Sequence, residues 1–166
     1  MALLYPTLYK ERITDITPQE LHSRGIVGLL LDVDNTLTTH GSQHLSDEVR
    51  QWLQDMQSAG IAMTVVSNAR ESRVAPFAEQ LGLRHISLAC KPLPFGFVRG
   101  ARRLHLKRTQ CAVVGDQVFT DILGANLGRF VSIQLQPIQL ETEKPFFMMK
   151  RGIENWLYAR RKEKHR

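Results

Sequence analysis

Short apolar runs alternate with amphipathic stretches along most of this 166-residue chain. The stretch between Ser46 and Gly60 shows a helical pattern, because its large apolar residues recur at i, i+3, i+4 and i+7. These residues are Val49, Trp52, Leu53 and Met56. The run 29–31 is instead continuously apolar, and Asp32 stops it abruptly. Such a run is typical of a central parallel strand that leads into a loop.

The alternation as a whole predicts an α/β fold. Strands are expected at 26–31, 61–66, 85–89, 111–114 and 130–135. Helices are expected at 17–25, 46–60, 73–81, 94–106, 121–126 and about 147–162. Short connections between strands and helices favour a parallel sheet that is covered by helices on both faces. We therefore expect residues 1–166 to form a single domain around a five-stranded parallel sheet.

Polar side chains follow four of the predicted strands at the point where each strand ends. Asp32 and Asp34 follow the first strand, Ser67 the second, Lys91 the third and Asp116 the fourth. The carboxyl ends of parallel strands meet at one edge of the sheet, and ligands of such folds bind there. This grouping is the main functional signal in the sequence.

Asp32 and Asp34 are two residues apart, so in an extended chain both carboxylates face the same side. Two acids at the end of an apolar strand repel each other and lose solvation. They usually need a cation or a shared proton. For this segment alone an alternative stays open, namely an Asp-rich turn in which Asn35 caps a helix.

The rest of the sequence narrows the class of site. It has no Walker-type phosphate loop, no GxGxxG after a strand and no GxSxG around a serine. His40 and His44 are four residues apart but are expected in a solvated loop and not on a helix, which argues against zinc. Carboxylate oxygens favour Mg²⁺, whereas Lys91 and the Ser67 hydroxyl suit a phosphoryl group. Together these groups outline a phosphoryl-transfer site.

The order and spacing of these residues resemble the four motifs of the haloacid dehalogenase (HAD) superfamily. The matching segments are Asp32-Val33-Asp34-Asn35-Thr36, Ser67, Lys91 and GDQVFTD at 115–121. More narrowly, the chain resembles the subfamily IIIA phosphatases of the YqeG type. That resemblance rests on SNARESRVAPFAEQLG at 67–82, the Lys91-Pro92 pair, GDQVFTDILGAN at 115–126 and the basic terminal helix. It covers nearly all of residues 5–160.

The resemblance implies a HAD-like Rossmannoid three-layer sandwich and a set of acidic catalytic groups. Asp32 would be the nucleophile, and Asp34 would act first as the acid and then as the base. Asp32, Asp116 and Asp34, the last through its main-chain carbonyl, would hold Mg²⁺. Asp121 would support the metal site from nearby.

The resemblance also implies how the phosphate is held. Ser67, Asn68 and Lys91 would bind it, with Lys91 also steadying the nucleophile, while Thr36 would shape the loop after the strand. The intervals between Asp34, Ser67 and Lys91 leave no room for a large cap domain. The site should therefore be open, which suits large or surface-bound substrates.

The net charge of +6 is concentrated near the C-terminus, because residues 150–166 hold seven basic and two acidic residues, a net +5. A basic terminal helix either packs on the sheet with its charges in solvent or makes a peripheral contact with an anionic phospholipid membrane. Nucleic acid is the less favoured partner.

Cysteine content and the N-terminus point to a cytoplasmic protein. Cys90 and Cys111 lie in apolar runs, where we expect both to be buried. No signal peptide is evident, and no apolar run approaches the length of a membrane span.

The resemblance thus implies a Mg²⁺-dependent phosphomonoester hydrolase that works through an aspartyl-phosphate. Similar eukaryotic proteins dephosphorylate the lipid phosphatidylglycerophosphate to phosphatidylglycerol. Two alternatives stay open: the same chemistry on a nucleic-acid, protein or sugar phosphate, and an RNA- or ribosome-associated binding protein that uses the basic tail. Loss of the nucleophile would favour the binding protein, but Asp32 is present.

Overall fold

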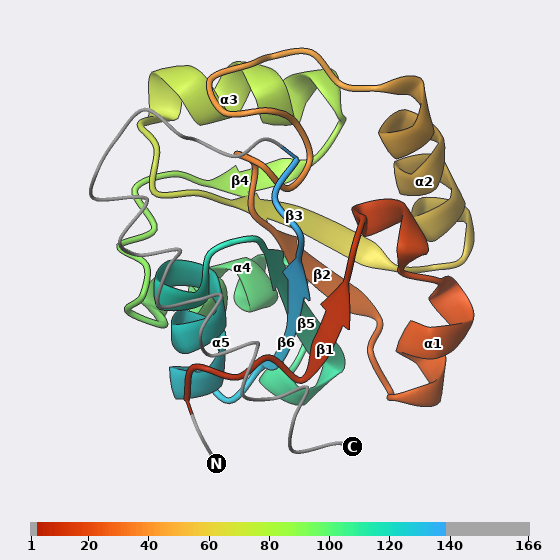
Figure 1. Cartoon of the computed structure of the whole chain (residues 1–166), viewed down its shortest axis with the longest axis vertical. Coiled ribbons are helices and arrows are strands. Elements are labelled where there is room, and N and C mark those ends of the chain that lie inside the picture. Colours follow the sequence, from red (N-terminus) through yellow and green to blue (C-terminus); the bar gives the residue numbers. More distant parts are fainter. Residues whose placement is uncertain (1–2, 139–166) are drawn as a thin grey trace.

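Residues 3–138, which the computed structural model describes, form a parallel sheet between two layers of helices (Figure 1). The strands are β1 (Leu8–Lys10), β2 (Gly28–Leu31), β3 (Ala62–Val66), β4 (Arg84–Ile86), β5 (Cys111–Gly115) and β6 (Val131–Leu135). Their order across the sheet is β1-β6-β5-β2-β3-β4, and every neighbouring pair is parallel. β2 therefore lies inside the sheet, hydrogen-bonded to β3 and β5.

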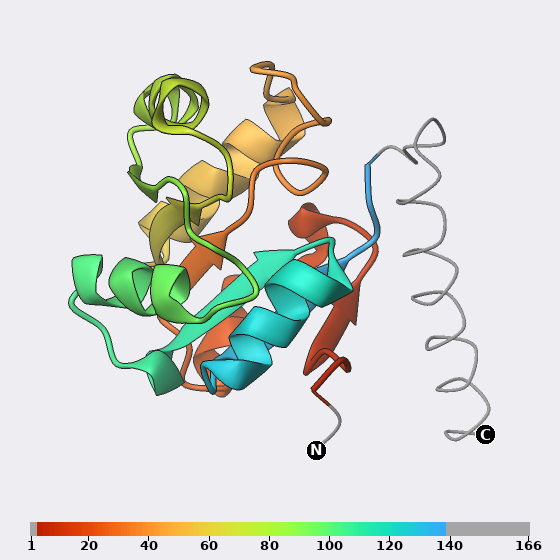
Figure 2. The ribbon, with the colours of Figure 1, turned by 90° about the vertical axis from the view of Figure 1, so that its left-hand side faces the viewer.

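Helices cover both faces of this sheet (Figure 2). The larger helices are α1 (Pro18–Ser23), α2 (Asp47–Ser58), α3 (Glu71–Gln80), α4 (Phe95–Arg103) and α5 (Leu123–Leu127). A π-helical turn, η3 (Val118–Ile122), leads into α5, and the short 3₁₀ turns are η1 (Ile13–Asp15) and η2 (Arg108–Gln110). The buried residues of α1, α2 and α3 belong to one apolar cluster, and those of α4 and α5 belong to the other.

The central strand β2 contributes to both apolar clusters. Leu29 and Leu31 pack in the cluster that contains Trp52 of α2, whereas Leu30 packs in the cluster that contains Phe97 of α4. All three leucines are completely buried, and burying a leucine contributes about 1.5–3 kcal/mol. Burial on both faces explains why this strand is continuously apolar instead of alternating.

The predicted helix after Ser46 is confirmed. The Ser46 hydroxyl accepts the Val49 N–H at 3.3 Å, which caps the first turn of α2. The four predicted core residues of α2 are buried, and Trp52 also donates its indole N–H to the Ile16 carbonyl at 2.9 Å. Gly60 follows the helix with a φ of 78°, a conformation that favours glycine.

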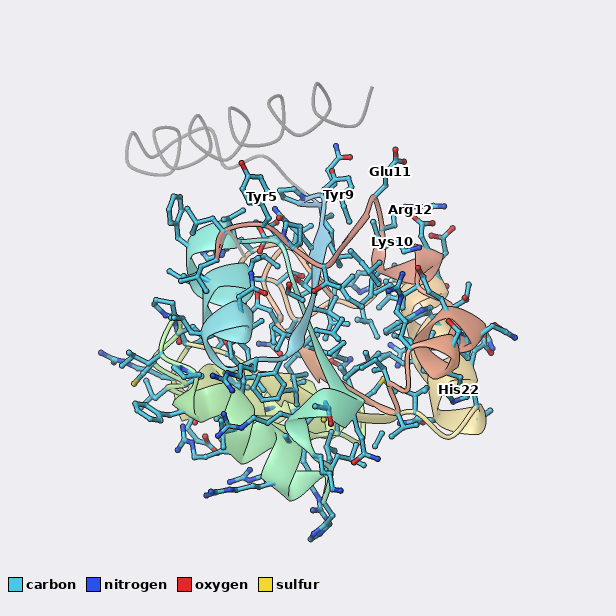
Figure 3. The ribbon with its side chains drawn as sticks, turned by 90° about the horizontal axis from the view of Figure 1, so that it is seen from below. Tyr5, Tyr9, Lys10, Glu11, Arg12 and His22 are labelled. Carbon is cyan, nitrogen blue, oxygen red and sulfur yellow. The ribbon has the colours of Figure 1, made fainter. Side chains whose placement is uncertain are left out.

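The sheet has six strands, not the five expected, because β1 was not predicted. β1 has only three residues, Leu8, Tyr9 and Lys10, and it pairs with β6 at the edge of the sheet. Three residues are too few to show a strand period. Tyr9 and Lys10 lie towards one side of the molecule when it is seen from below (Figure 3). The Lys10 ammonium pairs with Glu20 of α1 at 2.8 Å.

Two other predictions are corrected around β4. The predicted strand 85–89 ends at Ile86, since Leu88 and Cys90 have positive φ values of 43° and 58° that break an extended chain. Cys90 is consequently exposed, whereas Cys111 is buried as expected. The helix predicted at 73–81 begins two residues earlier, since α3 starts at Glu71, and Pro76 lies inside it.

The chain segments that join β2 to β3 and β3 to β4 each contain one helix. α2 is the helix between β2 and β3, and α3 is the helix between β3 and β4, so no cap domain is inserted there. Within residues 3–138, no helix is long and apolar enough to cross a bilayer. The predicted basic helix at about 147–162 lies outside the described residues.

Candidate active site

Three buried carboxylates gather at the carboxyl edge of the sheet. Asp32 follows β2 and Asp116 follows the neighbouring strand β5, and the Asp32 N–H donates to the Val114 carbonyl at 3.0 Å. Asp121 reaches the same place from η3. One carboxylate oxygen from each of Asp32, Asp116 and Asp121 lies within 4.8 Å of the other two. Acids from distant parts of the chain therefore meet at one point.

Gly115 is required for the position of Asp121. A Cβ atom at Gly115 would lie 2.4 Å from Cγ of Asp121, well inside van der Waals contact. The Gln117 N–H donates to Asp121 Oδ2 at 3.2 Å and fixes the carboxylate from the other side. The glycine before Asp116 thus allows the third acid to approach the strand end.

Lys91 joins two of the three acids. Its ammonium donates to Asp32 Oδ1 at 2.5 Å and to Asp121 Oδ1 at 2.6 Å, and its side chain is only 3% exposed. Asn68 holds the Lys91 backbone, because its amide oxygen accepts the Lys91 N–H at 2.7 Å and its amide nitrogen donates to the Lys91 carbonyl at 3.1 Å. The Asn68 side chain therefore positions the lysine. A phosphate contact by Asn68 stays a prediction.

Burial and mutual repulsion shift the pKa values of these groups. Burial raises the pKa of Asp32 to about 7; Lys91 opposes this effect, and the negative charge of Asp121 adds to it. Burial lowers the pKa of Lys91, but the attraction of Asp121 and Asp32 outweighs that effect, and the net pKa is raised. Lys91 is therefore a cation at neutral pH, and the Asp32 carboxyl is harder to ionise than an ordinary aspartate because its pKa is raised.

The donor set fits a divalent hard cation. With all three acids ionised, the carboxylates and the single ammonium would leave a net charge of −2 in a buried site. Buried charge of this kind needs compensation. Carboxylate oxygens are the ligands that Mg²⁺ prefers, and Asp32, Asp116 and Asp121 are close enough together to hold one ion. Asp121, expected only to support the metal site, belongs to this cluster itself.

The Asp34 carboxylate is not in the cluster of Asp32, Asp116 and Asp121; it is held instead by groups at the mouth of the site. Arg73 Nη2 and the Gly41 N–H both donate to Asp34 Oδ1, the latter at 3.0 Å. His40 Nδ1, on an exposed side chain, lies 3.7 Å from the same oxygen. A metal contact by Asp34 would therefore fall to its main-chain carbonyl, which stays a prediction. Arg73 was not predicted, because nothing in the sequence separates it from other helical arginines.

The remaining predicted residues also lie at this edge of the sheet. Ser67 follows β3, is buried, and accepts the Ala69 N–H at 3.1 Å through its hydroxyl. Thr36 is buried in the loop after Asp34, and within the described residues its hydroxyl has no hydrogen-bond partner. His44 contributes its backbone, since its carbonyl accepts the Thr38 hydroxyl at 2.5 Å.

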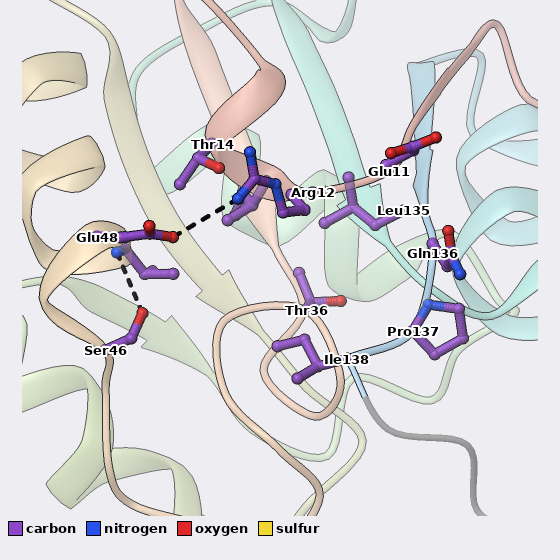
Figure 4. Close-up of a pocket in the computed structure, with 12 residues that line it drawn as sticks. Glu11, Arg12, Thr14, Thr36, Ser46, Glu48, Leu135, Gln136, Pro137 and Ile138 are labelled. Carbon is purple, nitrogen blue, oxygen red and sulfur yellow. Dashed lines mark hydrogen bonds and ion pairs between the residues drawn. The ribbon is translucent and has the colours of Figure 1, made fainter.

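A separate hollow of about 410 Å³ lies beside the loop that carries Thr36 (Figure 4). It opens between the turn after β1, the start of α2 and the end of β6. Its lining residues include Arg12, Glu48 and Gln136, whereas Asp32, Lys91 and Asp116 are not among them. The acidic cluster, and not this hollow, is the place where the reactive groups converge.

Comparisons with known proteins agree with this geometry. The family model for haloacid dehalogenase-like hydrolases matches residues 16–128, a range that contains Asp32, Asp34, Ser67, Lys91, Asp116 and Asp121. A Bacillus subtilis (strain 168) protein named probable phosphatase YqeG is 37% identical over 133 residues, which cover 80% of this chain and 77% of that protein.

Solved structures share the fold at low sequence identity. An uncharacterized protein from Listeria monocytogenes serotype 4b aligns with a TM-score of 0.58 and 16% identity, over 72% of this chain and 85% of that one. A 3-deoxy-D-manno-octulosonate 8-phosphate phosphatase from Yersinia pestis aligns with a TM-score of 0.51 and 16% identity, over 70% and 75% of the two chains. The chain belongs to the haloacid dehalogenase-like hydrolases, as a phosphatase related to YqeG.

Proposed function

We propose that this protein is a magnesium-dependent phosphomonoester hydrolase in which Asp32 forms an aspartyl-phosphate. One observation carries the proposal. Asp32 shares a buried, net-negative site with Asp116, Asp121 and Lys91, and that site has the donors for one divalent cation. We also propose that residues 1–166 form one phosphatase domain.

In the first step, an Asp32 carboxylate oxygen attacks phosphorus and the bond between phosphorus and the leaving oxygen breaks. Asp34 gives its proton to that leaving oxygen, so the product alcohol departs neutral. In the second step, Asp34 takes a proton from water, and the water oxygen attacks the phosphorus of the aspartyl-phosphate. Inorganic phosphate leaves, and Asp32 is restored.

The neighbouring groups offset the charge of the phosphoryl group. The Lys91 ammonium steadies Asp32 and meets the phosphoryl oxygens, and the Ser67 hydroxyl donates to one of them. Bound Mg²⁺, held by Asp32, Asp116 and Asp121, would supply Lewis-acid stabilisation of the negative charge. The two hydrogen bonds between the Asn68 side chain and the Lys91 backbone keep the lysine in place during both steps.

The absence of a cap between β2 and β4 supports a large or surface-bound substrate, because nothing from those intervals closes over the site. We propose a lipid phosphomonoester, with phosphatidylglycerophosphate as the first compound to test. The basic segment 150–166 supports contact with an anionic surface by its charge alone. A sugar, protein or nucleic-acid phosphate is the alternative with the same chemistry.

The direct experiment measures hydrolysis of p-nitrophenyl phosphate by the purified full chain with Mg²⁺. We expect Asp32→Asn to lower kcat by at least roughly 10³-fold, because the nucleophile is lost. Asp47→Asn is the matched control, since Asp47 is an exposed acid at the start of α2, and it should keep full activity. Equal rates for Asp32→Asn and wild type would refute the assignment. A panel that contains phosphatidylglycerophosphate and water-soluble phosphates then separates the substrate classes.

A further inference from the structure

Three large apolar side chains are exposed on one short segment, the 87–95 loop, which joins β4 to the first residue of α4. Leu88, Leu93 and Phe95 are 57%, 51% and 67% exposed. They are three of the seven large apolar side chains that are exposed in residues 3–138. Single exposed apolar side chains are ordinary on a protein surface, but three within one short loop make a patch that water solvates poorly.

The inner side of the 87–95 loop is fixed to the active site. Ala89 and Lys91 point inward and are buried, and Lys91 carries the ammonium that contacts Asp32. The N–H groups of Leu88 and Ala89 each donate to a main-chain carbonyl of the 67–69 segment at 3.0 Å. Leu88 also has a φ of 43°, a backbone conformation that residues other than glycine rarely adopt, and its side chain is exposed to solvent. The outer patch is therefore a fixed feature at the mouth of the site.

The charged residues of the chain segment that contains this loop are all basic, and Glu71, an exposed acid that contacts the segment, is hydrogen-bonded to Ser87 and His85. Residues 80–115 contain seven Lys and Arg residues and no Asp or Glu. Phe95, Arg99 and Arg102 are spaced i, i+4 and i+7 on α4 and are exposed, while Gly96 and Phe97 face the core. One stripe of α4 thus begins with an aromatic ring at the active-site end and continues with two arginines.

We propose that the 87–95 loop and this stripe of α4 form a docking surface for an anionic lipid membrane. Leu88, Leu93 and Phe95 would enter the boundary between headgroups and acyl chains, and Arg99 and Arg102 would pair with lipid phosphates. This is the arrangement of amphipathic segments that lie in the plane of a membrane surface.

Charge favours a membrane over a second copy of the chain as the occupant. Two copies that met through this face would bring their arginines together. Residues 80–115 hold no acid to neutralise them, and Glu71, the exposed acid that contacts the loop, already accepts hydrogen bonds from Ser87 and His85. An anionic bilayer supplies both the apolar phase and the counter-charge. Docking would also place Lys91 and Asp32 next to the lipid surface. The substrate would then be a lipid-anchored phosphomonoester, and this last step alone rests on the proposed function.

Vesicle sedimentation with the full chain tests the docking surface without any need for catalysis. Vesicles of phosphatidylcholine with phosphatidylglycerol should bind the wild type, and Leu93→Ser with Phe95→Ser should lower the partition coefficient at least about tenfold. Arg99→Gln should lower it about fivefold at low salt. Tyr9→Ser, which removes an aromatic ring exposed to 45% on β1, is the matched control and should bind like wild type. Equal binding by the double variant and wild type would overturn the proposal.

Cys90 provides a labelling site that can report insertion of the 87–95 loop into a membrane. Cys90 is exposed within the loop, whereas Cys111 is buried and burial raises its pKa to about 11, so an environment-sensitive fluorophore will label Cys90 selectively. Its emission should shift to the blue when anionic vesicles are added, and an unchanged spectrum would overturn the proposal. So would a dimer that the double variant dissociates while vesicle binding stays intact, since that result assigns the patch to a second copy. Hydrolysis of p-nitrophenyl phosphate, measured separately, reports on the proposed function alone.

Discussion

Removal of the Lys91 cation should unbalance the acidic cluster and destabilise the protein. In Lys91→Met, Asp32 and Asp121 lose the ammonium that contacts them at 2.5 and 2.6 Å, in a site where the lysine side chain is 3% exposed. Breaking a buried ion pair by removing one partner costs about 3–5 kcal/mol. For a domain of this size each kcal/mol corresponds to about 2–4 °C, so we expect Tm to fall by roughly 6–20 °C at pH 8 without metal.

The loss should depend on pH in a defined direction. The pKa of Asp32 is raised to about 7 in the folded protein, so the folded state binds its proton more tightly than the unfolded chain does. Proton binding by Asp32 therefore stabilises the fold. The stabilisation is fully present below a pH of about 4, the pKa of the unfolded chain, and is lost as the pH rises through about 7. Without Lys91 the carboxylate is harder to ionise, so the penalty should be larger at pH 8 than at pH 5.

Thermal unfolding at both pH values, in EDTA and in Mg²⁺, measures these effects. Mg²⁺ should raise the Tm of Lys91→Met more than that of wild type, because the ion replaces part of the missing positive charge. Lys107→Met removes an exposed lysine and should leave Tm nearly unchanged. The charge-balance reasoning is refuted if Lys91→Met and wild type melt together at pH 8, or if their difference is the same at pH 5.

Three further predictions concern the surroundings of this site. Gly115→Ala would place a Cβ 2.4 Å from Cγ of Asp121, so Mg²⁺ affinity measured by calorimetry should fall at least about tenfold; unchanged affinity would show that the acid is free to move. Arg73→Gln removes a donor to Asp34 Oδ1, so kcat should fall several-fold with little change in KM, and Arg73→Lys should restore part of it; a change confined to KM would contradict this positioning role. Mg²⁺ binding requires ionised Asp32, so its affinity should fall by up to about tenfold per pH unit below about 7 and stay level above; a flat profile from pH 5.5 to 8.5 would argue against Asp32 as a ligand.

The strand ends could be predicted from the sequence because apolar runs stop there at a polar residue. The end of β2 at Asp32 and the end of β5 before Asp116 are marked in this way, and parallel strands bring such ends to one edge. β1 could not be found by the same reasoning, since three half-exposed residues carry no period. The turn at Leu88 and Cys90 was also missed, because positive φ values at residues other than glycine leave little trace in the sequence.

Contacts between side chains were harder to predict than positions along strands. Asn68 and Ser67 look equally suited to a phosphate in the sequence, yet the Asn68 amide forms hydrogen bonds with the Lys91 backbone. Arg73 reaches Asp34 only because α3 packs beside the loop after β2, which depends on tertiary structure. Asp121 joins the acidic cluster because a π-helical turn and a glycine let it approach β5.

The central claim is that the carboxylate at the end of β2 is the group that becomes phosphorylated. The most direct measurement quenches the full chain during turnover of p-nitrophenyl phosphate with Mg²⁺, reduces acyl phosphates with borohydride and maps the peptides by mass spectrometry. We predict conversion to homoserine at position 32, dependent on substrate and on Mg²⁺. Sustained turnover with an unmodified Asp32, or with conversion at another acid, would contradict the account.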